Sequence, residues 1–348
     1  MRAAVVNTPG STPVCADFPD PEQRPGQAPL RLVGAGLHHV VRGLAAGRHY
    51  GSSRAYPLVP GIDAVARTGD GRLVYTGLAR SPWGTMAEWL VTPFEVELPA
   101  GADPLAVAAG MNPAVAGWMP LVARREEVGE LGTVLVLGAT GMSGSLAVRA
   151  ALSLGAKQVI AAGRDQEALE RLRGLGAVTV PLPAAAPDAG TRALAAPDAG
   201  ARALAGPDAG TTAPATPDAR TTALAAAVAE AQPALVLDFV WGSVAEAAFA
   251  ALGRTGTDDS EPIDYVQIGS LAGAEAALPA ALLRSRRIRI SGSGAGSVSK
   301  AEMIAAFPDI IARFGDGTFD VPYTTFPLSR VGEAWAHQGR TRAVIVPD

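Results

Sequence analysis

A glycine-rich run, GATGMSG, is the strongest chemical signal in the sequence. It matches the three-position fingerprint of a dinucleotide-binding turn. Gly141 lets the backbone approach a pyrophosphate, Gly144 lets the following helix pack closely on the strand, and N–H groups at the helix start bind phosphate oxygens. A glycine-rich turn that serves only tight packing is the alternative. The predicted cofactor-binding residues are Gly138, Ala139, Thr140, Gly141, Met142, Ser143 and Gly144.

The tip of the next strand indicates which dinucleotide is bound. An NAD site carries a carboxylate there to accept a hydrogen bond from the ribose 2′-hydroxyl. Here the strand ends in Gly163-Arg164-Asp165. A glycine leaves room for a phosphate and a guanidinium offers it a fork of donors, so Gly163 and Arg164 predict NADP(H). Two alternatives stay open: Arg164 pairs with Asp165 or Glu167, or Asp165 itself reaches the ribose.

The elements around this turn alternate between apolar strands and amphipathic helices, which predicts an α/β fold with a doubly wound parallel sheet. Strands are expected at 133–140, 157–163, 177–182, 233–240, 264–270 and 287–293, with helices at 141–156, 165–177 and 245–254. Ligands of such sheets lie at the carboxyl ends of the strands. Further cofactor contacts are therefore predicted at Phe239, Val240, Ile268, Gly269 and Ser270.

The rest of the chain has a different sequence pattern. About a hundred N-terminal residues form short β-type segments separated by Gly and Pro, which indicates a partly open β-barrel. We expect the C-terminal tail to fold back on this domain. We predict one domain from residues 1–118 and 309–348, and a nucleotide-binding domain from 119–308. Four near-identical decapeptides at 186–225 offer little but Ala to bury, and are interpreted as a low-complexity surface insertion.

Composition limits the function classes. The 348 residues carry a formal net charge of −4, with basic residues scattered, so no nucleic acid partner is expected. The single cysteine, Cys15, forms no internal disulfide, and no secretory leader or run of about 18 uninterrupted apolar residues is visible. A cytoplasmic protein without membrane contact, acting on a small molecule, is expected.

Several segments together resemble the medium-chain dehydrogenase/reductase superfamily, most closely its zinc-free quinone oxidoreductase branch. They are VLVLGATGMSGSLAVRAALSLGA, LVPGIDAVA, GTMAEW, LVLDFVWG and FPLSRVGEAWAHQGRTRAVIVP, and the resemblance spans nearly the whole chain outside the decapeptides. It implies a GroES-like catalytic domain built from both termini, a Rossmann domain between them, a cleft that binds the nicotinamide, and usually a homodimer or tetramer; a homodimer is expected here.

The same resemblance makes the zinc question testable by position. Zinc-dependent members place ligands after an early glycine and in a Gly-His-Glu segment. At these places the chain has Gly36-Leu37-His38-His39 and Gly61-Ile62-Asp63, and Ile62 cannot bind a metal. A catalytic zinc needs three protein ligands, so no metal is predicted.

Without a Lewis acid, hydride transfer to a quinone or an α,β-unsaturated carbonyl is the favoured reaction, because the developing enolate needs only a hydrogen-bond donor. Candidate catalytic residues are Tyr50 and His38. His38 stands where quinone oxidoreductases have an asparagine. Asn112 and Trp118 are expected beside the substrate pocket, with a helix N-cap as the alternative for Asn112.

Two other functions stay open at this stage. One is a pathway-specific reductase or dehydrogenase acting on an imine or ketone of secondary metabolism. The other is an NADPH-binding protein without turnover, a role that crystallins related to this branch can take. NADPH oxidation assayed against a panel of quinones, enones, imines and ketones separates these functions.

Overall fold

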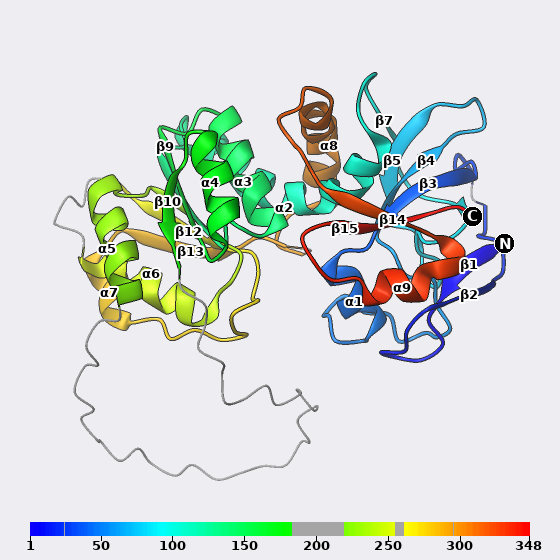
Figure 1. Cartoon of the computed structure of the whole chain (residues 1–348), viewed down its shortest axis with the longest axis horizontal. Helices are drawn as coiled ribbons and strands as arrows, with labels where there is room; N and C mark the ends of the chain where they lie inside the picture. Colours follow the sequence, from blue (N-terminus) through cyan, green and yellow to red (C-terminus); the bar gives the residue numbers. More distant parts are fainter. Residues whose placement is uncertain (24, 183–218, 255–260, 295) are drawn as a thin grey trace, which may run out of the picture.

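The computed structural model describes residues 1–23, 25–182, 219–254, 261–294 and 296–348. Two lobes lie side by side, with the helices α2 (Pro104–Val128) and α8 (Lys300–Gly315) between them (Figure 1). One lobe holds a six-stranded parallel sheet. The other holds a seven-stranded mixed sheet and a separate two-stranded ribbon.

The parallel sheet has the strand order β10-β9-β8-β11-β12-β13. This order reverses between β8 and β11, which is where doubly wound sheets bind their ligands. All six strands predicted from the sequence are present. Their bounds are β8 (Thr133–Leu137), β9 (Gln158–Gly163), β10 (Val178–Pro181), β11 (Leu235–Asp238), β12 (Ile263–Gln267) and β13 (Ile288–Gly292).

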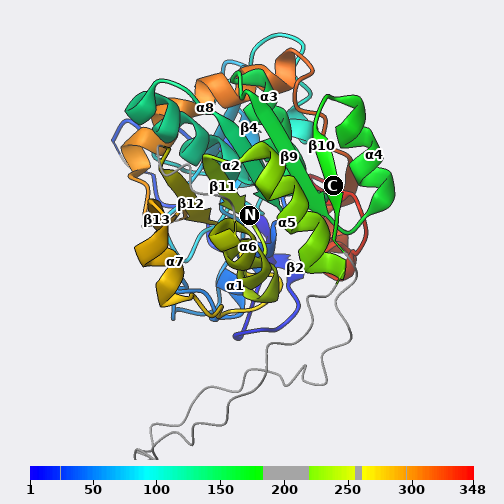
Figure 2. The ribbon, with the colours of Figure 1, turned by 90° about the vertical axis from the view of Figure 1, so that its left-hand side faces the viewer.

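Helices cover both faces of this sheet, because its buried strands alternate their side chains between two apolar clusters (Figure 2). Val134 and Val136 of β8 join the cluster under α2 and α3, whereas Leu135 and Leu137 join the cluster under α5 and α6. The helices of this lobe are α3 (Met142–Ser153), α4 (Gln166–Gly174), α5 (Ala219–Ala231), α6 (Gly242–Arg254) and α7 (Ala280–Ser285).

Both ends of the chain build the second lobe. Its sheet has the order β14-β15-β3-β4-β5-β7, with β6 paired to β3, and β15 from the C-terminus lies against β3. The predicted α/β class, with a doubly wound sheet and a discontinuous β-rich domain, is therefore confirmed. The strands are β1 (Arg2–Val5), β2 (Val14–Asp17), β3 (Leu30–Gly36), β4 (Asp63–Arg67), β5 (Leu73–Gly77), β6 (Trp89–Leu90), β7 (Val96–Glu97), β14 (Tyr323–Pro327) and β15 (Arg342–Val346); the helices are α1 (His39–Ala45), η1 (Leu328–Arg330) and α9 (Val331–Ala336).

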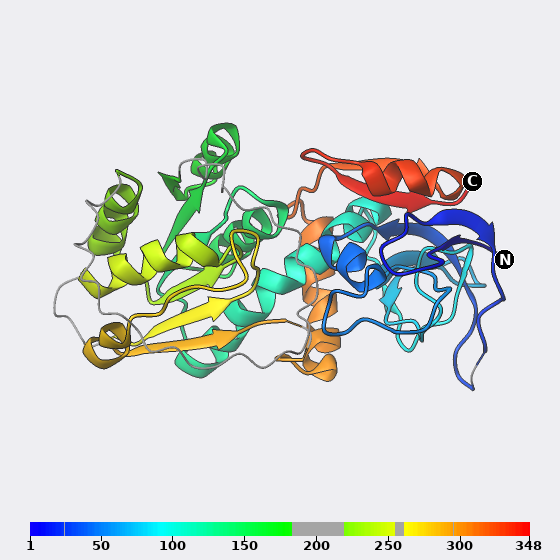
Figure 3. The same cartoon turned by 90° about the horizontal axis from the view of Figure 1, so that it is seen from below.

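Helix α2 is shared by the two lobes. It packs on α3 and α8 and also on β3, and Figure 3 shows it in cyan beside the orange α8 at the junction. The predicted domain boundaries at 118 and 308 fall inside α2 and α8, and the division itself stays a prediction. All but 219–225 of the decapeptide repeats lies outside the described residues; that last part begins α5.

By length and composition α2 is apolar enough to cross a membrane, with a mean hydropathy of 1.4 in its most apolar window. Asn112 interrupts its apolar run, so a search for uninterrupted segments overlooks it. Of that window, 67% is buried inside the protein. The helix is therefore explained by core packing between the lobes.

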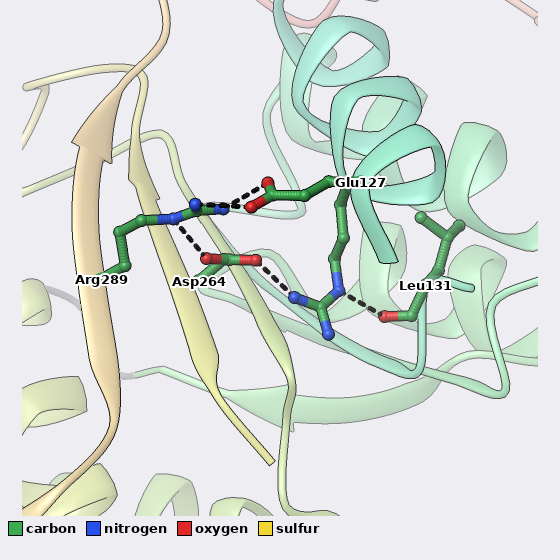
Figure 4. Close-up of polar contacts among 5 residues, drawn as sticks. Glu127, Leu131, Asp264 and Arg289 are labelled. Carbon is green, nitrogen blue, oxygen red and sulfur yellow. Dashed lines mark hydrogen bonds and ion pairs between the residues drawn. The ribbon is translucent and has the colours of Figure 1, made fainter. Parts of the chain in front are cut away.

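A network of ion pairs fixes the C-terminal end of α2 to the parallel sheet (Figure 4). The buried Arg124 donates through Nε to the carbonyl of Leu131 at 3.2 Å and through Nη1 to Asp264 of β12. Asp264 also accepts from Arg289 Nε at 2.9 Å, and Arg289 forms a bidentate pair with Glu127. A buried charge pair of this kind is costly to break from one side.

We expect Asp264→Asn to lower the free energy of unfolding by about 3–5 kcal/mol, because it leaves the Arg124 guanidinium buried without a counter-charge. Urea denaturation followed by intrinsic fluorescence measures this. The control is Glu333→Gln, which removes an exposed pair with Arg330 and should leave the midpoint nearly unchanged. Equally small shifts for both variants would contradict the role assigned to the network.

Candidate functional site

The glycine-rich turn joins β8 to α3 at the carboxyl edge of the sheet. Gly138 has a φ of 83°, and Gly141 is the N-cap of α3, where no side chain caps the helix. A Cβ on Gly144 would lie 2.2 Å from the carbonyl oxygen of Gly138, so any larger residue would push the helix off the turn. Because Gly141 has no side-chain acceptor, the N–H groups of the first turn remain open to an anion.

Two further strand ends meet this turn. A Cβ on Gly138 would lie 2.7 Å from Val240, and a Cβ on Gly269 would lie 2.4 Å from the carbonyl oxygen of Phe239. The ends of β8, β11 and β12 thus converge, as the sequence predicted for ligand-binding segments. Ile268 donates its N–H to the carbonyl of Asp238 at 2.7 Å, while Ser270 is exposed beyond it.

The carboxylate of Asp238 fixes the backbone just after β11. Its Oδ1 accepts from the backbone N–H groups of Val240 and Trp241, both at 2.8 Å, and its Oδ2 accepts from the Tyr265 hydroxyl at 2.6 Å. Burial raises the pKa of Asp238, although these hydrogen bonds oppose the shift. Asp238 is fully buried and holds the backbone of Val240 and Trp241 in place.

The tip of β9 differs from its predicted form in one respect. Gly163 is buried, and a Cβ there would lie 2.4 Å from Cγ2 of Thr140, so the glycine first makes room for Thr140. Arg164 donates its backbone N–H to Thr140 Oγ1 at 3.4 Å and has an exposed side chain.

The interpretation in which Arg164 pairs with Asp165 or Glu167 is wrong. Both carboxylates instead bind Arg340, at 2.9 Å for Asp165 and more closely for Glu167. Asp165 also accepts from the Ala168 N–H at 3.1 Å as the N-cap of α4. Among the described residues no ion pair holds the guanidinium of Arg164, which leaves a free cation beside the glycine-rich turn.

His38 is the N-cap of α1, two residues after the end of β3, and is only 2% exposed. Its Nε2 lies 3.1 Å from Asp63 Oδ1, and Asp63 Oδ2 accepts from the Tyr75 hydroxyl at 3.0 Å. Burial and the neighbouring Asp63 raise the pKa of Tyr75 well above its usual value, so Tyr75 stays a donor. The Nδ1 atom of His38 is buried and has no partner among the described residues.

Tyr50 lies apart from His38, in the loop after α1. Its side chain is 77% exposed and its ring stacks on His49 at a centroid distance of 4.0 Å. The hydroxyl lies beside the loop after β13, since a Cβ on Gly294 would come within 3.5 Å of it. The structure therefore shows no contact between the two candidate catalytic residues, and their roles stay predictions.

Asn112 and Trp118 lie inside α2. The N-cap alternative for Asn112 is wrong, because α2 begins at Pro104 with Asp103 as its N-cap. Asn112 is half-buried. Trp118 is 4% exposed and packs edge-on against Phe319 in the core. Trp118 also lines a cavity of about 520 Å³. The described lining of this cavity includes no residue of the glycine-rich turn, so the cavity is separate from the turn.

Sequence reasoning missed Arg342, which reaches from β15 across the junction of the lobes. Its Nη1 donates to the carbonyl of Leu37 at 3.3 Å and its Nη2 lies 3.5 Å from Sδ of Met142, at the start of α3. Nε is buried without a partner among the described residues. Burial, with repulsion from Arg42, lowers the pKa of Arg342 to about 10. The sequence signal for it is an RTR triplet (340–342) that runs into the start of β15.

Comparisons with known proteins agree with this architecture. The chain is 29% identical over its whole length, and over the whole length of the relative, to a probable NADPH-dependent quinone reductase, tdiC, from Emericella nidulans. The quinone oxidoreductase of Thermus thermophilus, solved also with NADPH, matches with a TM-score of 0.71 at 21% identity, over 99% of this chain and 100% of that one.

The chain has the fold of the medium-chain dehydrogenase/reductase superfamily. An alcohol dehydrogenase superfamily protein from Novosphingobium aromaticivorans matches all of both chains with a TM-score of 0.72 at 19% identity. The fold that the resemblance implies is thereby confirmed. No family model matches the chain. Within the described residues of this superfamily fold, no three His, Cys, Asp or Glu side chains gather in a group that could hold a metal ion.

We expect Gly144→Ala to destabilise the protein by about 1–3 kcal/mol, because its Cβ meets backbone atoms of Gly138 and Ala139 that cannot move away cheaply. Thermal melting measures the loss. Gly174→Ala is the matched control, since a Cβ at this α4 position meets nothing within 4 Å. That control should keep or slightly raise the melting temperature. Equal melting temperatures for both variants would refute the packing role of Gly144.

Proposed function

We propose that the chain is an NADPH-dependent oxidoreductase of the quinone reductase type, which transfers hydride to a quinone or an α,β-unsaturated carbonyl. The observation that carries this proposal is the guanidinium of Arg164 beside the glycine-rich turn, which forms no ion pair with the described part of the chain, while the neighbouring Asp165 is engaged by Arg340. The name of the Emericella nidulans relative supports the same activity.

The residues present fit NADP(H). The uncapped N-terminus of α3, with Gly144 against Gly138, forms a cradle for a pyrophosphate, and Arg342 adds a half-buried cation at Met142. Arg164 would bind the 2′-phosphate. Gly269, Ser270, Phe239 and Val240 would line the nicotinamide half, and bound NADPH supplies the hydride. The protein's own contribution is to hold the two reactants in register and to exclude competing geometries.

We further propose that the reaction needs no zinc. Ile62 stands at a position where the zinc-dependent branch requires a ligand, and Cys15 lies on β2 beside Arg2. His38 is already engaged by Asp63. A quinone or enone needs a hydrogen-bond donor for its developing negative charge rather than a metal, and Tyr50 can supply a hydroxyl from the loop after α1.

We also propose an oligomeric state and a cellular location for the chain. The chain would form a homodimer along β13, because this strand is an edge of the parallel sheet and an edge offers unpaired backbone groups to a second copy. Arg289 and Ser291 of that strand are exposed. A cytoplasmic location fits a chain with one cysteine and no disulfide to maintain.

NADPH should bind more tightly than NADH, and Arg164→Ala should remove most of the difference. A charge-assisted contact to phosphate is worth about 1.5–3 kcal/mol, so a loss of about tenfold or more in NADPH affinity is expected. Fluorescence titration with both cofactors measures it. Arg173→Ala, which removes an exposed arginine of α4 away from the tip of β9, is the control and should keep the preference. Equal affinities of the unmodified protein for the two cofactors would end the assignment of NADP(H).

Activity should be unaffected by a chelator, and Tyr50→Phe should lower turnover by about 10²–10³-fold, as expected for a donor that stabilises developing negative charge. NADPH oxidation with a saturating quinone measures both. Tyr56→Phe is the control, since that hydroxyl only bonds the carbonyl of Ala45 at 2.9 Å. Loss of activity with the chelator and recovery with zinc would overturn the zinc-free assignment. Full activity of Tyr50→Phe would show that Tyr50 is not the donor, and solvent would then be the proton source.

A further inference from the structure

The segment between α9 and β15 carries an arginine from the β-rich lobe to the start of α4 in the nucleotide-binding lobe. Arg340 Nη2 lies 2.9 Å from Asp165 Oδ2, and Nη1 donates to Glu167 Oε2. The partners lie far apart in the sequence, and the two carboxylates come one and three residues after Arg164. Arg340 thus lies where the two lobes meet at the tip of β9.

These contacts decide the charge around Arg164. Glu167 also accepts from Arg171 at 2.8 Å, and the pKa of Glu167 is lowered by its hydrogen bond to Arg340 and by the charges of Arg340 and Arg171. With Arg340 in place, the five charged side chains Arg164, Asp165, Glu167, Arg171 and Arg340 together carry one net positive charge. Without Arg340 they carry none.

The contacts also decide what Asp165 can do. Its Oδ1 accepts from the Ala168 N–H as the cap of α4, so Oδ2 is the oxygen that Arg340 occupies. A carboxylate oxygen at this strand tip is what an NAD site uses to accept from a ribose hydroxyl. Without Arg340, the negative charge of Asp165 would be unpaired and would repel a phosphate bound at Arg164.

We propose that Arg340 is a specificity-determining residue: it engages Asp165 and Glu167 across the lobe junction, so that the site accepts a ribose 2′-phosphate in preference to a 2′-hydroxyl. Arg340 acts through these carboxylates and is a positioning residue. The inference rests on the proposed function, the binding of NADP(H). It adds that cofactor choice is set in part by the C-terminal segment of the other lobe.

The test is a set of dissociation constants for NADPH and NADH, measured by fluorescence titration at low salt. Arg340→Ala should lower NADPH affinity and raise NADH affinity, reducing the ratio of the two by about tenfold, with a smaller effect at high salt. Arg340→Ala combined with Asp165→Asn should restore most of the NADPH preference, because asparagine keeps the helix cap but not the charge. Arg330→Ala is the matched control: Arg330 has similar exposure and a glutamate partner within α9.

Titration with adenosine 2′,5′-bisphosphate and with 5′-AMP repeats the comparison without the nicotinamide, so its result is independent of turnover. A ratio that moves in Arg340→Ala but not in Arg330→Ala supports the proposal. If both cofactors lose affinity equally, Arg340 only holds the lobes together and the proposal is wrong. If the unmodified protein binds neither NADPH nor the bisphosphate, the proposed function fails first and the inference with it.

Discussion

The pairing of Arg124 with Asp264 is the constraint on which the arrangement of the lobes depends. It locks the last turns of α2 to β12, while the first half of the same helix packs on β3 of the other lobe. One rigid helix therefore sets the relative position of the parallel sheet and the β-rich lobe. Because the guanidinium and the carboxylate are both buried, neither can leave the other without a large desolvation cost.

With the two lobes held in this way, the candidate site forms where glycines at the strand ends let neighbouring segments come close. Gly144 against Gly138, Gly138 against Val240, and Gly269 against Phe239 each place main chain where a side chain would not fit. Polar groups then take positions by hydrogen bonding to this backbone, as Asp238 does at the corner of β11. The candidate site is thus a meeting of three strand ends, with side chains added at its rim.

The sequence predicted the parallel sheet and its glycine-rich turn well, because both depend on local signals: apolar runs of strand length, and glycines at a defined spacing. It also predicted the discontinuous domain, from the short β-type segments at the start of the chain and a C-terminal tail expected to fold back on them, and the family resemblance agreed with that division. It could not show that Asp165 pairs with Arg340, since Arg340 is distant in sequence. For the same reason Arg342 was missed, and Asn112 was given a capping alternative that the long helix α2 excludes.

Because a chain is synthesised from its N-terminus, β15 is made after the strand β3 with which it pairs. The parallel sheet is continuous in sequence, whereas β3 waits for β15, whose Val344 and Ile345 pair with Gly36 and Ala35. Arg340 and Arg342 emerge from the ribosome with that last strand. Domains fold as units during synthesis, so the parallel sheet can form before Arg340 and Arg342 have been made. If Arg340 sets the cofactor preference as proposed, that preference is established only once β15 has been made.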